Sequence, residues 1–171
     1  MQFTHIIVPL HHQNNNKYMD IKELYKLYLA HPCITTDSRE CPKDSIFLAL
    51  KGASFDGNRF AQAALEKGCA YAIVSELTNP ETQKDDCRYI VVNDTLQTFK
   101  DLAREHRRHF QLPIIGITGT NGKTTTKELT KAVLAECYNV MATEGNFNND
   151  IGVPKTLFRL NEDYDIAVVE M

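Results

Sequence analysis

The sequence predicts an α/β protein built from two units, and three observations lead to this fold class. Short apolar runs that are typical of buried strands alternate with amphipathic helical segments along most of the chain. Such alternation favours parallel strands joined by helices. The apolar run at 113–118 is followed by a glycine-rich turn and a helix, the arrangement of a phosphate-binding loop. We therefore expect a small α/β domain over 19–112, followed by the truncated start of a P-loop, parallel-sheet domain over 113–171.

The composition excludes several classes of protein. The chain has 171 residues, of which 43% are apolar and 24% charged, the usual globular mix. Its net charge of −3 argues against nucleic acid or an anionic membrane as a general partner. No apolar run approaches the roughly 18 residues of a membrane span. Five cysteines without a C-x-x-C pair predict reduced thiols in a cytoplasmic protein, and not a disulfide framework or a zinc site.

The first 18 residues differ from the rest of the chain. They contain the polar, low-complexity stretch "HHQNNNKY". From Met19 onward the sequence has a helical pattern, with Asp20 and Glu23 at the spacing of a capping box. The apolar face of this helix is expected to comprise Ile21, Leu24, Tyr25 and Tyr28. We expect 1–18 to be a disordered or non-native leader and Met19 to be the native start.

Four strands and two further helices are expected in the first unit. Gly68 and Asp94 mark boundaries, because glycine suits a left-handed C-terminal cap and aspartate caps a helix N-terminus. The strands are expected within 33–50 (two strands around a polar turn), 69–75 and 88–93. The helices are expected over 56–68, with Phe60, Ala64 and Leu65 inward, and over 94–110, with Leu96, Phe99 and Ala103 inward.

The second unit repeats the alternation of strands and helices. A buried strand at 113–118 precedes the glycine turn, and the helix after the turn carries Leu129, Ala132, Val133 and Cys137 on one face. Further expected elements are a strand at 139–143, a loop at 144–154, a short helix at 154–160 and a strand at 164–171. A parallel sheet that ends on its third strand has not covered its faces, so we expect the chain to be part of a longer protein.

The glycine turn predicts a nucleotide site. Glycines at 116, 119 and 122 allow backbone N–H groups to approach phosphate oxygens at a helix N-terminus. The general P-loop pattern is not met, because Ile117 stands where its first glycine belongs. The Gly122-Lys123-Thr124 core is present, with Lys123 suited to the β and γ phosphates of ATP and Thr124 to Mg²⁺. The expected ATP-binding residues are Gly119, Thr120, Asn121, Gly122, Lys123, Thr124 and Thr125.

Three stretches of the chain carry a resemblance to a known family. The stretch "TGTNGKTTT" resembles the ATP loop of the Mur ligases and their relative folylpolyglutamate synthase, which join an amine to a carboxylate with ATP. Residues 35–74 resemble the UDP-sugar-binding domain that E-type and F-type Mur ligases share. The loop "EGNFNNDIGVP" resembles the F-type loop after the ATP helix. Together the resemblance covers about 19–171.

The resemblance implies a reaction and its reactants. ATP and Mg²⁺ would convert the carboxylate of UDP-N-acetylmuramoyl-tripeptide into an acyl phosphate, which the amine of D-alanyl-D-alanine then attacks. The enzyme would be a cytoplasmic monomer of peptidoglycan precursor synthesis, and this chain alone would be inactive. Two alternatives stay open: an E-type ligase that adds a diamino acid to the dipeptide precursor, and a nucleotide-binding module without ligase activity.

The resemblance also assigns roles to residues. Lys123 would be catalytic, and Thr124 and Glu170 would be metal ligands. Ser38 and Arg39 would bind the UDP portion, since arginine suits bidentate contacts to phosphate. Asn146, Asn148 and Asn149 of the 144–154 loop suit contacts with substrate or phosphate, and they also suit turn formation. The remaining expected substrate-binding residues are Lys51, Gly52, Asp56, Gly57, Asn146 and Asn149.

Overall fold

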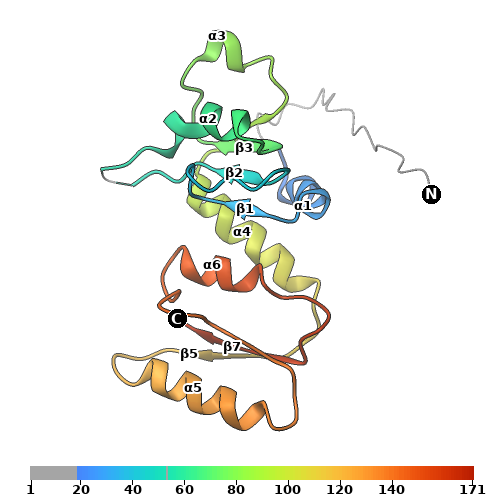
Figure 1. Ribbon diagram of the computed structural model, residues 1–171, viewed down its shortest axis with the longest axis vertical. Helices are drawn as coiled ribbons and strands as arrows, with labels where there is room; N and C mark the ends of the chain where they lie inside the picture. Colours follow the sequence, from blue (N-terminus) through green and yellow to red (C-terminus); the bar gives the residue numbers. More distant parts are fainter. Residues whose placement is uncertain (1–18, 53) are drawn as a thin grey trace, which may run out of the picture.

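Two parallel sheets lie one above the other along the long axis of the molecule, and the helix α4 (Thr95–Arg108) runs from one toward the other (Figure 1). The computed structural model describes residues 19–52 and 54–171, so the predicted leader 1–18 lies outside the described residues. The α/β class expected from the sequence is confirmed. None of the helices in these two ranges has the length and hydrophobicity of a membrane span.

The first unit is a four-stranded sheet with helices on both faces. Its strands are all parallel and follow the order β1-β2-β3-β4. They are β1 (Ile34–Thr35), β2 (Ile46–Leu48), β3 (Tyr71–Val74) and β4 (Tyr89–Val91). The helical segments are α1 (Ile21–Ala30), the 3₁₀ turn η1 (Gly57–Phe60), α2 (Ala61–Glu66), α3 (Pro80–Gln83) and α4.

Successive side chains of β2 belong alternately to two hydrophobic clusters, one on each face of the sheet. Ile46 and Leu48 pack with residues of α1 and α4, whereas Phe47 packs with residues of α2 on the opposite face. Successive side chains of a strand point to opposite faces, so one strand supplies both clusters. The predicted caps are confirmed: the Asp94 carboxylate accepts a hydrogen bond from Gln97 N, and Gly68 has φ 117°.

Two details of the first unit differ from expectation. Phe60 was expected to face inward, but it is 39% exposed and stacks on Phe55. The reason is that residues 57–60 form a 3₁₀ turn, whose tighter winding directs the ring away from the core. The short helix α3, which begins at Pro80, was not predicted.

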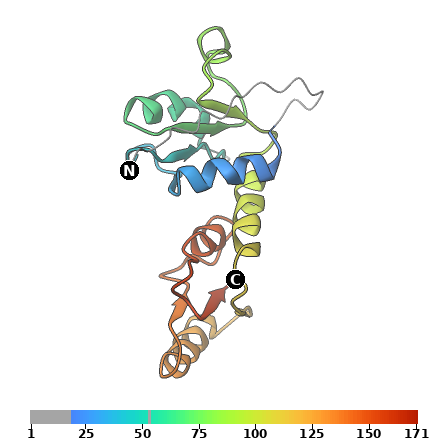
Figure 2. The ribbon, with the colours of Figure 1, turned by 90° about the vertical axis from the view of Figure 1, so that its right-hand side faces the viewer.

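The second unit is a three-stranded parallel sheet with one helix on each face. Its strand order is β5-β7-β6, so the last strand in sequence is the central one. The helix α5 covers the face away from the first unit, and α6 lies on the other face, beside α4 (Figure 2). The elements are β5 (Ile114–Ile117), α5 (Lys123–Leu134), β6 (Val140–Ala142), α6 (Gly152–Leu157) and β7 (Ile166–Glu170).

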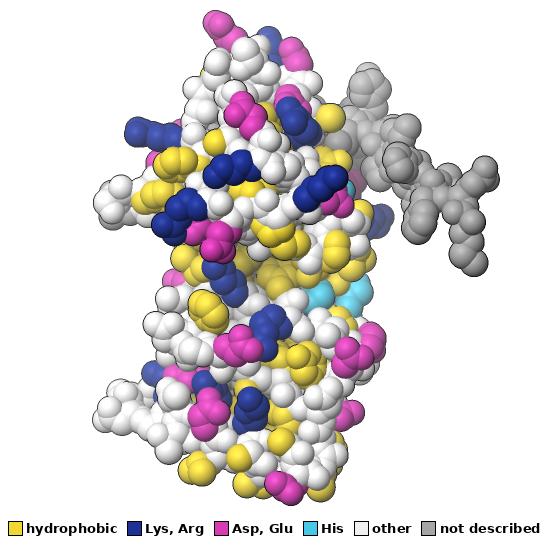
Figure 3. Space-filling model, in the orientation of Figure 1, with side chains coloured by type: hydrophobic (Ala, Val, Ile, Leu, Met, Phe, Trp, Pro, Cys, Tyr) yellow, Lys and Arg dark blue, Asp and Glu magenta, His cyan; other side chains and the backbone are white. Residues whose placement is uncertain are grey.

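Burial in the second unit departs from the sequence pattern. The strand β5 was expected to be buried, but Ile115 is 36% exposed because β5 is an edge strand of the described sheet. On α5, Leu129 is 64% exposed and Val133 74% exposed, and hydrophobic side chains are visible at the lower end of the molecule (Figure 3). The most buried side chain of this helix is that of Lys127. The apolar positions of α5 therefore do not face the three strands that the structure describes.

His106 and Phe158 join the two units. Phe158, just after α6, lies with its ring centroid 4.9 Å from that of Tyr28 and 5.5 Å from that of His106. His106 Nε2 lies 3.1 Å from the carbonyl oxygen of Leu160, and its Nδ1 lies 3.1 Å from Tyr25 Oη. Because a carbonyl can only accept, Nε2 carries the proton and Nδ1 accepts from the tyrosine hydroxyl. A neutral imidazole thus connects α1, α4 and the second unit.

We expect the folded chain to lose stability as the pH falls, in part through His106. Burial, and secondarily the nearby His109, lower the pKa of His106, against an opposing effect of the bond to the Leu160 carbonyl. The unfolded state therefore binds a proton more readily, and stability decreases as the pH drops through the unfolded value of about 6.5. Urea midpoints of wild type should fall between about pH 7.5 and about pH 5.5, and His106→Gln should show a smaller fall. Equal falls in wild type and His106→Gln would contradict the expectation.

Candidate functional site

The glycine turn between β5 and α5 has the backbone of an anion-binding loop. Gly119 has φ 146° and Gly122 has φ 76°, conformations that residues with a side chain rarely adopt. Gly122 occupies the N-cap position of α5, so the first N–H groups of this helix have no intrahelical partner. The Lys123 ammonium donates a hydrogen bond to the Gly119 carbonyl at 2.8 Å. The loop therefore presents backbone N–H groups, a helix N-terminus and an ammonium in one place.

A pocket of about 350 Å³ opens at this loop. Most of the predicted ATP-binding residues line it, together with the predicted metal ligand Glu170 at the end of β7. Gly119 does not line the pocket, but its carbonyl holds Lys123. The complete lining is Thr120, Asn121, Gly122, Lys123, Thr124, Thr125, Asn148 and Glu170.

Glu170 and Thr124 meet at the base of this pocket. The Thr124 hydroxyl lies 3.2 Å from each carboxylate oxygen of Glu170, and Asn148 Nδ2 donates to Oε1 at 2.9 Å. Glu170 is only 2% exposed. The hydrogen bond from Asn148 is the main cause that lowers the pKa of Glu170, and Thr124, Lys127 and Lys123 act in the same direction. The carboxylate is therefore held in its charged form.

The Thr124–Glu170 pair fits a magnesium ion by its chemistry and spacing. Mg²⁺ prefers oxygen ligands in an octahedron at about 2.0–2.1 Å, which puts neighbouring ligand oxygens about 3 Å apart. The hydroxyl and carboxylate oxygens of this pair are 3.2 Å apart. An ion of this kind keeps several waters and contacts phosphate, so two protein ligands suffice.

The asparagine side chains of the loop after β6 have different roles: one lines the pocket, and another stabilises the start of α6. Asn148 points into the pocket, as its bond to Glu170 shows. Asn149 Oδ1 accepts hydrogen bonds from Ile151 N and Gly152 N, so this side chain caps the start of α6. Asn146 is exposed, and its carbonyl accepts from Asn148 N. Asn146 and Asn149, which the sequence assigned to substrate, do not line the pocket that Asn148 lines.

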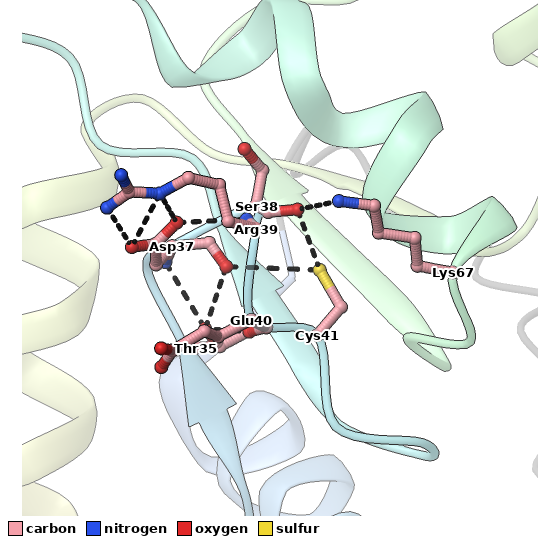
Figure 4. A network of polar contacts seen from close by, with 7 residues as sticks. All are labelled: Thr35, Asp37, Ser38, Arg39, Glu40, Cys41 and Lys67. Atoms are coloured by element: carbon pink, nitrogen blue, oxygen red, sulfur yellow. Dashed lines mark hydrogen bonds and ion pairs between the residues drawn. The ribbon is translucent and has the colours of Figure 1, made fainter.

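The loop after β1 is ordered by its own polar contacts (Figure 4). The Arg39 guanidinium makes a bidentate pair with Asp37, at 2.9 Å from Nε to Oδ1 and 2.6 Å from Nη2 to Oδ2. These bonds hold the pKa of the Asp37 carboxyl well below its usual range. Lys67 donates to the Ser38 carbonyl at 2.7 Å, and the Thr35 hydroxyl donates to the Glu40 carbonyl. Asp37 orders the loop, and the other guanidinium edge of Arg39 faces outward, with its side chain 86% exposed.

The loop after β2 lies at the same edge of the sheet, because all four strands are parallel. Lys51 pairs with Glu76 at 2.9 Å, and Gly52 N donates to the Phe55 carbonyl. Asp56 caps the following turn by accepting from Asn58 N. Gly57 packs so closely on the backbone of Leu50 that a Cβ there would lie 2.5 Å from its carbonyl oxygen. The topology thus brings the predicted UDP-binding residues of the first unit to one sheet edge.

A second pocket, of about 340 Å³, lies between this sheet edge and α6. Asp37 and Glu40 contribute from the β1 loop, and Lys155 and Phe158 contribute from the second unit. Ser38 and Arg39 do not line it. Sequence reasoning did not consider Lys155, because nothing in its local pattern shows that α6 faces the first sheet.

Lys127 is the other residue that sequence reasoning missed. Its side chain is buried, and its Nζ lies 3.7 Å from Glu170 Oε2. A signal was available: Lys127 follows Lys123 by four residues, so both lie on one face of the helix.

Comparisons with known proteins identify similar chains. The protein-family model of the Mur ligase middle domain matches residues 117–171. A second family model, described as Mur ligase family, catalytic domain, matches residues 32–107. The chain is 47% identical to a UDP-N-acetylmuramoyl-tripeptide–D-alanyl-D-alanine ligase of Synechocystis sp., over 81% of this chain and 30% of that protein. It therefore spans less than a third of that relative's length.

Solved structures agree with this similarity. The MurF ligase of Thermotoga maritima in complex with ADP superposes with a TM-score of 0.75 at 32% identity, over 84% of this chain and 32% of that one. A UDP-N-acetylmuramoyl-L-alanyl-D-glutamate–2,6-diaminopimelate ligase superposes less well, with a TM-score of 0.52 at 26% identity, over 81% of this chain and 31% of that one.

Proposed function

Because the chain belongs to the Mur ligase family, we propose that it forms two parts of a UDP-N-acetylmuramoyl-tripeptide–D-alanyl-D-alanine ligase. These parts are the UDP-substrate-binding domain, 19–112, and the start of the ATP-binding domain, 113–171. The pocket at the start of α5 supports the proposal most directly, since it combines a phosphate loop, a lysine and the Thr124–Glu170 pair. The ADP complex of the similar MurF ligase is consistent with ATP use.

In this proposal the residues of the pocket have separate roles in the activation of the substrate carboxylate. Backbone N–H groups of 119–125 bind the phosphates of ATP. The Lys123 ammonium leaves the Gly119 carbonyl to contact the transferring phosphoryl group and offsets its charge. Thr124 and Glu170 would hold Mg²⁺, which when bound neutralises charge on the phosphates. Asn148 keeps Glu170 ionised and oriented.

The first unit would bind the nucleotide end of UDP-N-acetylmuramoyl-tripeptide. Ser38, Arg39, Lys51, Gly52, Asp56 and Gly57 lie on loops at the carboxyl edge of its sheet, where ligands of parallel sheets bind. We assign Asn146 and Asn149 to the substrate side of the second unit. The whole protein would act as a cytoplasmic monomer, on D-alanyl-D-alanine as second substrate.

The decisive experiment uses the full-length protein that contains this chain. Phosphate release from ATP is followed with Mg²⁺ and UDP-N-acetylmuramoyl-tripeptide, with and without D-alanyl-D-alanine. Phosphate release that requires D-alanyl-D-alanine supports the proposal. Release only with UDP-N-acetylmuramoyl-dipeptide and a diamino acid would instead identify an E-type ligase. Nucleotide binding without release in either mixture would point to a binding module.

Replacing Arg39 is expected to weaken substrate binding without slowing the chemistry. A hydrogen bond to a charged group contributes about 1.5–3 kcal/mol, so Arg39→Ala should raise KM for the UDP substrate by about 10- to 100-fold. The kcat should change little, because Arg39 lies on the β1 loop of the first unit and does not line the pocket at the ATP loop. Arg88→Ala is the matched control, since Arg88 makes the same bidentate pair with Asp86 before β4. Equal KM values for the two variants would show that Arg39 does not bind the UDP substrate.

A further inference from the structure

Lys127 is a buried cation in the middle of the second unit. Its side chain is only 2% exposed, although it lies on a helix whose neighbouring positions are largely exposed. Burying an unpaired ammonium is costly, so a lysine in such a place requires acceptors around it. The sheet-facing side of α5 carries Lys123 at its first position and Lys127 one turn later.

Three oxygen atoms surround the Lys127 ammonium. Its Nζ donates to the Thr143 carbonyl at 2.8 Å and lies 3.1 Å from Glu128 Oε1 and 3.7 Å from Glu170 Oε2. An ammonium has three N–H groups, so each of these acceptors has a donor available. Lys127 does not line the pocket, and its ammonium lies beside Glu170, which does.

Thr143 completes a closed set of contacts between three elements. Its carbonyl accepts from Lys127 on α5, and its hydroxyl accepts from Glu170 N at 2.9 Å, at the end of β7. Lys127 and Thr143 together thus hold both the backbone and the carboxylate of Glu170. The carboxylate is thereby kept where Thr124 Oγ1 lies 3.2 Å from both of its oxygens.

We propose that Lys127 is a positioning residue for the magnesium–phosphate site. Its ammonium, fixed by the Thr143 carbonyl, keeps the Glu170 carboxylate next to the Thr124 hydroxyl. The inference rests on the proposed function, since it assigns Glu170 and Thr124 to the cation that accompanies ATP. The role is indirect, comparable to the outer-shell partners that orient metal ligands, whose loss typically weakens metal affinity by about 10- to 100-fold.

The test measures ADP binding to the full-length protein by calorimetry over a series of Mg²⁺ concentrations. For Lys127→Met, we expect the Mg²⁺ concentration that gives half of the gain in ADP affinity to rise by about tenfold or more. The affinity for ADP without Mg²⁺ should stay within about twofold of wild type, because Lys127 does not reach the phosphate loop. Lys131→Met, an exposed lysine one turn further on α5, is the matched control and should bind as wild type.

The outcomes separate the inference from the proposed function. A wild-type protein that does not bind ADP would overturn both. A wild type that responds to Mg²⁺ and a folded Lys127→Met that responds at the same or a lower concentration would overturn only the inference. Lys127→Gln, which keeps an N–H donor, is the second variant if Lys127→Met does not fold. If neither variant folds, Lys127 has a structural role and the inference fails.

Discussion

Replacing Lys123 with alanine in the full-length protein is expected to lower kcat for D-alanyl-D-alanine-dependent phosphate release by about 100- to 1,000-fold. Lys123 begins α5 at the N-terminal end of the helix, and its ammonium already lies over the loop, 2.8 Å from the Gly119 carbonyl. The ammonium is therefore placed where charge develops on the transferring phosphoryl group. Alanine removes this charge and leaves the helix start otherwise unchanged, because alanine is a good helix former.

Single-turnover and steady-state measurements would establish the size of this effect. Lys131→Ala is the control, because it removes an exposed lysine from the same helix. Thermal unfolding of both variants would show whether the fold is intact. A Lys123→Ala protein with kcat within about threefold of wild type would contradict the assignment of Lys123 as the catalytic residue.

The second large effect is expected for Glu170→Gln, which keeps the size of the side chain but removes its charge. Thr124 and Asn148 both donate to the carboxylate, and the buried Lys127 ammonium lies beside it. An amide presents one acceptor in place of two, and it cannot serve as an anionic ligand for Mg²⁺. We expect kcat/KM for ATP to fall by about 100-fold or more and a higher Mg²⁺ concentration to be needed for half-maximal rate.

A matched substitution separates this effect from a general loss of negative charge. Glu144→Gln changes an exposed glutamate that pairs with Arg159 in the same unit, and it should leave the Mg²⁺ dependence unchanged. If Glu170→Gln also retained the wild-type Mg²⁺ dependence, Glu170 would not be a metal ligand.

The strand order explains why distant residues meet in one pocket. β5, β6 and β7 are parallel, so their carboxyl ends lie at the same edge of the sheet. The glycine loop leaves β5, the asparagine loop leaves β6, and Glu170 ends β7. Because β7 is the central strand, Glu170 lies between the two loops, within hydrogen-bond distance of Thr124 and Asn148. The strand order thus determines which residues meet at the pocket.

Local features of the fold could be predicted because their causes lie within a few residues. Asp20 and Asp94 cap helices through the backbone N–H groups that follow them, and Gly68 ends a helix by its own backbone conformation. The Gly122-Lys123-Thr124 core likewise specifies its turn and helix start without help from the rest of the chain. Such features need only the geometry of neighbouring peptide units.

Other features depend on contacts that local sequence does not encode. Among three nearby asparagines, Asn148 reaches Glu170 and Asn149 caps α6, because of the path of the loop between β6 and α6. Thr124 meets a carboxylate that is 46 residues away in sequence. Such pairs form only once the strand order is established.

The sequence by itself determined the α/β class, the order of the main strands and helices, and the phosphate loop, since each follows from periodicity, caps or glycines over a short span. Only the tertiary structure decided which face of α5 meets the sheet. The apolar positions Leu129 and Val133 are exposed there, and Lys127 is buried beside Glu170. The physical reason is that helical periodicity specifies the angles between side chains, but not the direction from which the rest of the chain packs against the helix.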